Sequence, residues 1–341
     1  MSLIKALLSL GLAAAAANAA STKVDIWARL SKPAVRKDFT GFEQLLATHL
    51  PETQHNISVW TSGWIPSDCN GYASSHNVSA ADFVIYQIQY TDCSDPWIMC
   101  YHKDSETSIE SIAKQFGRIP IQMREWVSYI STKNRVGTYP PLTHGPTPQV
   151  KHVVTIPDKM GWAYEDKGNT IYMRPSDAMQ TTMIHETAHA VDLNGGYGGS
   201  VLSGSSLWAD NYAQDSHVPD DYSATDTVED IAQSTVVAVL NVNVPGPDGG
   251  FATIEPNWRD VFHQYATIIT QARNYGRGNS MLVPGENVAC AHRIPNSEPV
   301  AINTLTRVFK ASRPDVSLSK HVKAISVLNE HFGPTNCTIH W

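Results

Sequence analysis

The sequence contains no run of five or more basic residues, and its formal net charge is −7 at pH 7. Nucleic acids and anionic membranes attract clustered positive charge, so both are poor partners for this chain. A membrane-spanning helix needs about 20 apolar residues, and no uninterrupted apolar run reaches that length. Outside the first 20 residues we find no internal repeat and no low-complexity tract. These absences predict a globular protein that binds neither nucleic acid nor membrane.

Cysteine is scarce, with five in 341 residues. They are Cys69, Cys93, Cys100, Cys290 and Cys337. In an oxidising compartment they allow at most two disulfides and one remaining thiol. We expect Cys290 to pair with Cys337, and Cys93 to pair with Cys100 or Cys69, although spacing alone does not determine connectivity.

The first 20 residues have the pattern of a secretory signal. A basic start at Lys5 precedes an apolar stretch of about a dozen residues, and small residues at Ala17 and Ala19 suit signal peptidase. Cleavage after Ala19 removes Lys5 and takes the net charge from −7 to −8. N-x-S/T sequons, which fit a eukaryotic secretory pathway, begin at Asn56, Asn77 and Asn336. We therefore expect a secreted, extracellular protein.

The composition is sufficient for a large packed core, with 42% hydrophobic residues, nine Trp and 13 Tyr. Periodicity predicts strands at 82–90, 97–102, 150–156 and 170–174. Helices are expected at 108–116, 121–130, between 175–177 and 194–195, at 206–213, 227–240, 258–273 and 319–332. We expect an α+β fold in which a small mixed sheet occupies an N-terminal lobe, about 20–195, and a mostly helical lobe covers about 196–341.

The segment M-I-H-E-T-A-H-A-V-D places His185 and His189 four residues apart, with Glu186 between them. On a helix, positions four apart differ by about 40° and about 6 Å, so both imidazoles leave one face and can bind one ion. Neutral imidazole suits zinc, and Glu186 can lie beside the metal as a general base for water. The alternative is two surface histidines on a solvated helix. The pattern favours a Zn²⁺ site that supports hydrolysis of peptides.

Catalytic zinc takes three protein ligands and leaves a fourth position open. A third histidine six residues after His189 is missing, because that position is Gly195. We favour Glu229, on the next long helix, as the third ligand; the alternative is a carboxylate that only stabilises the first turn of that helix. Competing carboxylates are Asp192, Asp226 and Asp230.

Two further side chains are candidates near this site. Tyr222 lies seven residues before Glu229 in an expected loop, from which its phenol could donate a hydrogen bond to an oxyanion. An ordinary half-buried loop tyrosine is the alternative. Gln233 lies four residues after Glu229 and is a candidate partner for the outer nitrogen of a ligand histidine.

These residues resemble known families. His185-Glu186-x-x-His189 with a distant glutamate resembles the gluzincin branch of the zincin metallopeptidases, and a tyrosine seven residues before that glutamate resembles anthrax lethal factor and its smaller relatives. Separately, three strings are similar to fungal secreted proteins described as conidiation-specific, of the type numbered thirteen. The strings are D-C-S-D-P-W-I-M-C from Asp92, F-G-R-I-P-I-Q-M-R from Phe116 and V-E-D-I-A-Q from Val228.

The zincin resemblance implies a zincin-like metallopeptidase fold over residues 20–341. It implies His185, His189 and Glu229 as Zn²⁺ ligands, and Glu186 and Tyr222 as catalytic groups. We therefore expect a secreted, monomeric zinc endopeptidase that hydrolyses protein or peptide substrates with metal-activated water.

The resemblance further implies a strand that runs antiparallel to bound substrate, for which 170–174 is the best match. The chain departs from the thermolysin pattern, because it lacks an N-E-x-x-S-D segment soon after His189. One alternative is an aspartate-ligated protease resembling deuterolysin, with Asp192 or Asp226 as ligand, but the G-T-x-D-x-x-Y-G signature of that group is missing. Another is a secreted spore or cell-wall protein that keeps a zincin scaffold without hydrolysis.

Overall fold

The computed structural model describes residues 26–302 apart from 27, 76–77, 106, 128–149, 156–163, 166–168, 174–178, 279, 285–289, 291–292 and 294–295. The signal segment, Asn77, Asn336, Cys337 and the helix expected at 319–332 lie outside the described residues. The α-helices are α1 (Phe42–His49), α2 (Ser67–Ser75), α3 (Ile109–Arg118), α4 (Ile121–Arg124), α5 (Gln180–Leu193), α6 (Ser206–Gln214), α7 (Thr227–Asn243) and α8 (Phe262–Tyr275). Short 3₁₀ turns are η1 (Ala80–Asp82), η4 (Phe251–Thr253) and η5 (Trp258–Val261).

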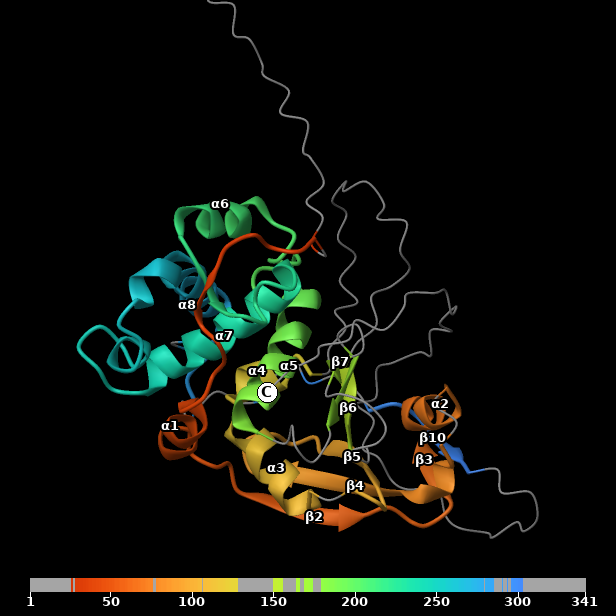
Figure 1. The fold of residues 1–341 in the computed structure, drawn as a ribbon. Coiled ribbons are helices and arrows are strands. Elements are labelled where there is room, and N and C mark those ends of the chain that lie inside the picture. Colours follow the sequence, from red (N-terminus) through yellow and green to blue (C-terminus); the bar gives the residue numbers. More distant parts are fainter. Residues whose placement is uncertain are drawn as a thin grey trace, which may run out of the picture.

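A six-stranded mixed sheet has the order β2-β4-β5-β6-β8-β7. Its strands are β2 (His55–Val59), β4 (Phe83–Tyr90), β5 (Trp97–His102), β6 (Val150–Thr155), β8 (Asn169–Met173) and β7 (Tyr164–Glu165). The β5-β6 and β6-β8 pairs are parallel, and the other three pairs are antiparallel. Two small sheets pair β1 (Ala34–Arg36) with β9 (Val218–Asp220), and β3 (Trp64–Pro66) with β10 (Pro299–Ala301). Figure 1 shows the large sheet on one side of the molecule and α6, α7 and α8 on the other.

Both faces of the sheet are covered at β5. Trp97 and Met99 pack into the main core with α3, α5 and α7, whereas Ile98 and Cys100 pack into a second core with α2 and β3. Because side chains of a strand alternate between its faces, an unbroken apolar strand such as this one indicates burial on both sides. The described residues thus form one extended core and one smaller core, separated by the sheet.

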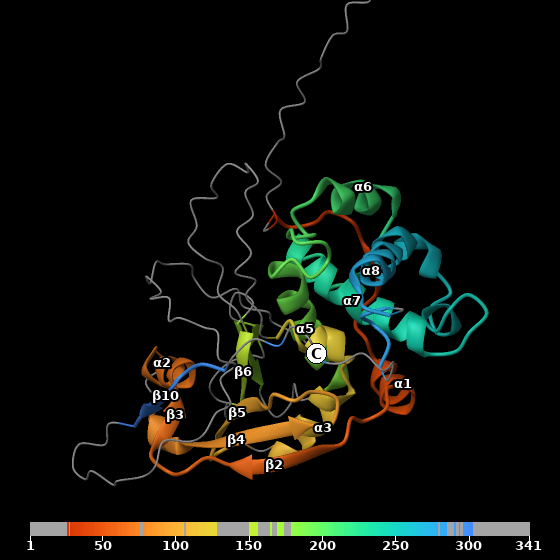
Figure 2. The ribbon, with the colours of Figure 1, turned by 180° about the vertical axis from the view of Figure 1, so that it is seen from behind.

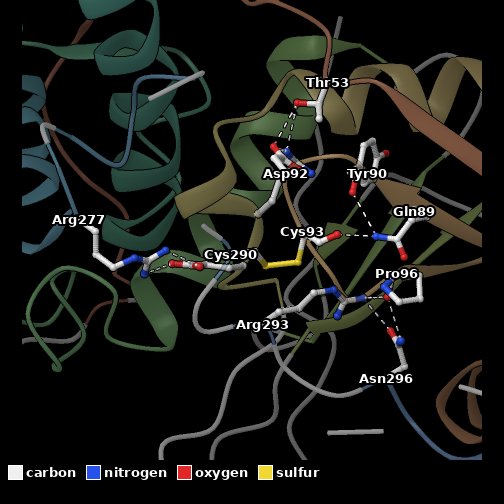
Figure 3. The surroundings of a disulfide bond; sticks show 12 residues. Thr53, Gln89, Tyr90, Asp92, Cys93, Pro96, Arg277, Cys290, Arg293 and Asn296 are labelled. Carbon is white, nitrogen blue, oxygen red and sulfur yellow. Dashed lines mark hydrogen bonds and ion pairs between the residues drawn. A yellow bond between two sulfur atoms is a disulfide. The ribbon is translucent and has the colours of Figure 1, made fainter. Parts of the chain in front are cut away.

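The structure corrects both expected disulfides. Cys69 of α2 pairs with Cys100 of β5, and Cys93 pairs with Cys290 (Figure 3). Cys93 lies in the main core and Cys100 in the second core, so the sheet separates them. Nearness in sequence was therefore a misleading guide, and the expected partner of Cys290 was also wrong.

The helix α5 lies between the sheet and the other helices of the C-terminal half. Figure 2, the view from behind, shows α5 with β6 on one side and α7 and α8 on the other. Each of its residues from Gln180 to Asp192 is buried. Its expected stop is confirmed, because Asn194 is the C-cap and Gly195 follows with a φ of 74°. The helix has therefore ended before the position at which a third histidine was sought.

Two expectations for individual elements are wrong. The helix expected at 121–130 ends at Arg124 in α4. The expected substrate strand is β8, but β7 already pairs with it through Tyr164 and Tyr172 and through Glu165 and Ile171. Along these residues β8 is internal to the sheet and β7 is the edge. Within the described part of the chain, no helix is both long and apolar enough to cross a membrane.

Candidate metal centre

The helix α5 brings the H-E-x-x-H residues into the interior. His185 and His189 are 1% and 2% exposed, and Glu186 is fully buried. The start of the helix is held from another element, because the carboxylate of Glu43 in α1 accepts hydrogen bonds from the backbone N–H groups of Gln180 and Thr181, both at 2.8 Å. A negative charge at this end also interacts favourably with the helix dipole. Two surface histidines on a solvated helix are thus excluded.

Glu229 of α7 meets the two histidines. The Nε2 atoms of His185 and His189 lie 3.0 Å apart, and Oε2 of Glu229 lies 3.1 Å from the first and 3.4 Å from the second. A tetrahedral zinc with bonds of 2.0–2.1 Å has ligand atoms about 3.3 to 3.4 Å apart. The three atoms are therefore spaced as three corners of a zinc coordination sphere. Among the described residues they are the only group of three such ligand atoms within 4.8 Å of one another.

A chain of hydrogen bonds lies behind His185. Its Nδ1 is 3.0 Å from Oε1 of Gln233, and Nε2 of Gln233 donates to Oδ2 of Asp220 at 2.7 Å. Oδ1 of Asp220 accepts from the backbone N–H and the hydroxyl of Ser223, at 2.9 and 2.8 Å. The expected contact between Gln233 and a ligand histidine is present in the structure.

The electrostatics of the buried group favour a cation. Burial lowers the pKa of His185, an effect only partly opposed by the nearby carboxylate of Glu229. Burial raises the pKa of Glu229, but the neighbouring His189 and His185 lower it more, so the net direction is downward. When the imidazole is neutral, its nitrogen lone pair and the carboxylate of Glu229 are two electron-pair donors 3.1 Å apart, and a divalent ion between them would bind all three ligand atoms.

The competing carboxylates have other contacts. Oδ1 of Asp226 accepts from the backbone N–H groups of Val228 and Glu229, both at 2.9 Å, so Asp226 is the N-cap of α7. Oδ1 of Asp192 accepts from the backbone N–H groups of Leu202 and Ser203. The third competitor, Asp230, is fully buried but does not join the group of ligand atoms. Geometry favours Glu229.

Tyr222 lies on the turn between β9 and α7. Its ring centroid is 5.7 Å from that of His185, with the rings tilted by 54°. The chain segment before α1 holds this turn, because Leu30 donates its backbone N–H to Ala224 O and Thr227 donates to Ile26 O, both at 3.1 Å. The expected loop position beside the site is therefore what the structure shows.

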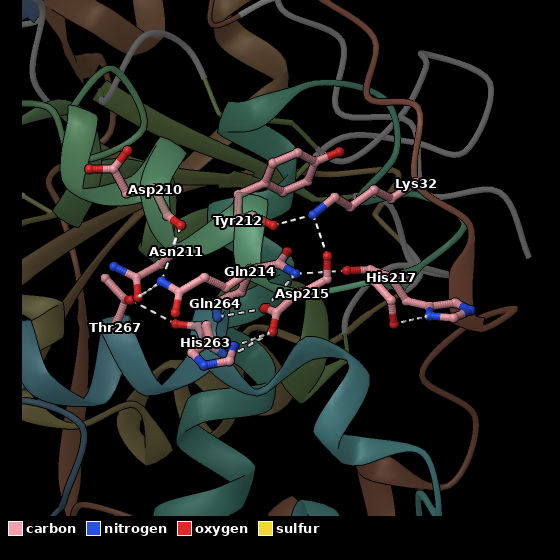
Figure 4. A network of polar contacts seen from close by, with 11 residues as sticks. Lys32, Asp210, Asn211, Tyr212, Gln214, Asp215, His217, His263, Gln264 and Thr267 are labelled. Carbon is pink, nitrogen blue, oxygen red and sulfur yellow. Dashed lines mark hydrogen bonds and ion pairs between the residues drawn. The ribbon is translucent and has the colours of Figure 1, made fainter.

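Three positioning features could not be found from sequence. Glu43 and Asp220 have no motif that marks them: Glu43 lies 137 residues before Gln180, and Asp220 lies 13 residues before Gln233 and in a different element. The third is the segment 26–36, in which Lys32 donates to the backbone carbonyls of Tyr212 and Asp215 (Figure 4). Strand alternation and helix periodicity predict elements, but they carry no information about contacts between elements.

One family and one curated relative match parts of this chain. The family described as conidiation-specific protein Con-13 matches residues 39–139. The chain is similar to this family. A curated relative, conidiation-specific protein 13 of Neurospora crassa, is 28% identical over 201 residues, which cover 57% of this chain and 52% of the relative. The chain thus spans about half the length of that relative. No solved structure matches the chain.

The Con-13 match includes α1, the strands β2 to β5 and the helices α2 to α4, but ends before His185. Arg124, a buried charged residue within the matched range, has a structural role. The buried guanidinium of Arg124 lies 4.6 Å from the ring of Tyr90, 5.2 Å from Trp97 and 5.9 Å from Phe116. It also forms an ion pair with Asp92, beside the Cys93–Cys290 disulfide (Figure 3). The strings from Asp92 and Phe116 therefore meet in one cation–π cluster.

Proposed function

We propose that the chain is a secreted, zinc-dependent metallopeptidase. The observation that carries this proposal is the spacing of three buried ligand atoms, two from α5 and one from α7, at 3.0 to 3.4 Å. Three protein ligands of this kind leave a fourth position for water or substrate. Secretion is supported by the signal pattern at the N-terminus and by two disulfides.

Zinc, when bound, supplies a Lewis acid for the peptide carbonyl and lowers the pKa of water. The remaining chemistry belongs to side chains. Glu186, which neighbours the ligand His185 and is fully buried, accepts the proton of the attacking water and returns it to the leaving amine. Tyr222 donates its phenolic hydrogen to the carbonyl oxygen as negative charge develops there.

Glu186→Gln tests this assignment. The change keeps the size of the side chain and removes the base, so we expect zinc stoichiometry to be unchanged and hydrolysis of denatured casein to fall by roughly 10²- to 10⁴-fold. Metal content by mass spectrometry and initial rates on the same sample measure the two effects separately.

Glu255→Gln is the matched control. Glu255 is buried, at 6% exposure, and accepts hydrogen bonds from Arg36 and from the backbone N–H of Asn257, outside the candidate site. Activity within a few-fold of the parent protein is expected there. A zinc-loaded Glu186→Gln protein that hydrolyses casein as fast as the parent would remove Glu186 from its proposed role.

A second candidate is a non-catalytic spore-associated protein that retains the metal centre. The similarity to a protein named for conidiation favours it, because the matched descriptions name no peptidase. The two candidates differ in one measurement. Fully zinc-loaded protein that cleaves neither denatured casein, nor a peptide library, nor glycosylated substrates supports the second candidate and contradicts the first.

A further inference from the structure

The side chains behind His185 form a directed chain of hydrogen bonds. Asp220, Ser223 and Gln233 are 3%, 0% and 3% exposed, so water does not substitute for any of the contacts. In its ionised form the carboxylate of Asp220 only accepts hydrogen bonds, and its two oxygens accept from Ser223 and from Gln233. The amide of Gln233 must therefore present its NH₂ group to Asp220.

This orientation determines the protonation of the imidazole. With its NH₂ group turned to Asp220, Gln233 presents its carbonyl oxygen to Nδ1 of His185, 3.0 Å away. Nδ1 must then carry the hydrogen, which leaves the lone pair of Nε2 directed at His189 and Glu229. A turned amide would do the reverse and place a hydrogen on Nε2, where it excludes a metal.

We propose that Asp220 is a positioning residue for the metal centre, which fixes the tautomer of His185 through the amide of Gln233. The inference rests on the zinc-binding part of the proposed function and does not require hydrolysis. Neither sequence motif nor family match includes Asp220, and it touches no ligand atom itself.

The same carboxyl group also shapes the turn that carries Tyr222. Asp220 ends β9, where it pairs with Arg36 of β1, and it accepts both hydrogen bonds from Ser223 across the turn. One side chain thus connects the metal ligand on α5 to the loop beside it. A purely structural role for Asp220 would be limited to holding this turn. The experiment therefore has to separate that role from an effect on the tautomer of His185.

The polarity of the hydrogen bonds provides that separation. In Asp220→Asn, the introduced amide can accept from Ser223 only with its carbonyl oxygen turned to Ser223. Its NH₂ group then faces the NH₂ group of Gln233, so two donors oppose each other. Adding Gln233→Glu restores an acceptor there, since a glutamate accepts from the introduced amide and from Nδ1–H of His185 together. A role confined to the Ser223 turn gives no reason for such a rescue.

The test measures the dissociation constant of Zn²⁺ by chelator competition, above the pKa of Asp220, with thermal unfolding of the metal-free proteins alongside. We expect Asp220→Asn to weaken zinc binding by roughly 10- to 100-fold, as is typical for loss of an outer partner of a ligand histidine. The double variant Asp220→Asn/Gln233→Glu should recover most of that loss. Cobalt(II) absorption bands should shift in the single variant and return toward the parent spectrum in the double variant.

Asp215→Asn is the control, because Asp215 is a buried aspartate of the same lobe that accepts from His263 and Gln264 at the start of α8 (Figure 4). It should lower stability and leave zinc affinity unchanged. Parent-like zinc affinity in Asp220→Asn overturns the inference, and so does a folded double variant without recovery. A parent protein that binds no zinc overturns the proposed function instead.

Discussion

At the scale of single residues, Tyr222 is the candidate that can be tested by removing one atom. Tyr222→Phe keeps the ring beside His185 and removes the phenolic hydrogen. We expect the turnover number to fall by roughly 10²- to 10³-fold with zinc content unchanged, as for loss of one oxyanion donor. Peptide hydrolysis and metal analysis on the same preparation measure this, with the exposed Tyr275 changed to Phe as control. An equal loss in both variants would contradict the assignment.

The raised pKa of Asp220 predicts how the stability of the metal-free protein depends on pH. Burial raises the pKa of its carboxyl from 3.8 to about 7. Between these pH values the carboxyl of Asp220 is ionised in the unfolded chain and protonated in the folded chain. Raising the pH therefore favours the unfolded state, and the free energy of unfolding falls. Asp226, whose pKa burial raises to about 6, adds in the same direction.

We expect the contribution of Asp220 to the free energy of unfolding, at most about 4 kcal/mol, to be present near pH 4 and mostly lost by about pH 7. Urea unfolding at several pH values should show a shallower decline for Asp220→Asn than for the parent. The same slope in both proteins would mean that Asp220 does not titrate in this window.

At this scale, spacing along single helices predicts most of the candidate site. It selected His185, His189, Glu229 and Gln233, which the structure brings together, because residues four apart share a helix face. It does not identify Asp220, because this residue ends a three-residue strand, and so short a strand has no sequence periodicity that predicts a contact with α7.

At the scale of elements, α1 and α5 are linked by Glu43. Its carboxylate accepts the first backbone N–H groups of the helix that carries both histidines. We expect Glu43→Ala to lower the free energy of unfolding by about 1 to 2 kcal/mol, the range for loss of an N-terminal cap. Chemical denaturation measures it.

Glu52→Ala is the comparison for this prediction, because its carboxylate pairs with Lys114 at a partly exposed site. Exposed ion pairs contribute about 0 to 1 kcal/mol, so a smaller change is expected. If the two variants are equally stable, Glu43 does not act as the cap of α5.

The elements themselves were largely predictable, whereas their partners were not. β4 and β5 follow the expected apolar patterns, and α7 begins at Thr227 as expected because Asp226 caps it. β7, only two residues long, gave no recognisable pattern, yet it occupies the edge where a substrate strand was expected along β8. Short elements contain too few residues for periodicity to appear.

At the scale of the whole molecule, the two disulfides differ in how much chain they enclose. Cys93 and Cys290 are 197 residues apart, and Cys69 and Cys100 are 31 apart. By loop-closure entropy the longer loop stabilises more, by about 1.5 kcal/mol. We expect Cys93→Ala/Cys290→Ala to be less stable than Cys69→Ala/Cys100→Ala by about that amount in guanidinium unfolding. An equal or reversed order would show that the long loop is already restricted in the unfolded chain.

The pairing of β1 with β9 also orders the events of biosynthesis. Residues near Ala34 emerge well before Val218, their partner, by roughly ten seconds or more at usual elongation rates. The turn that presents Tyr222 and the carboxylate of Glu229 come later still. A nascent chain therefore carries both histidines before Glu229 has been synthesised, so the candidate metal centre can assemble only after the start of α7 has emerged.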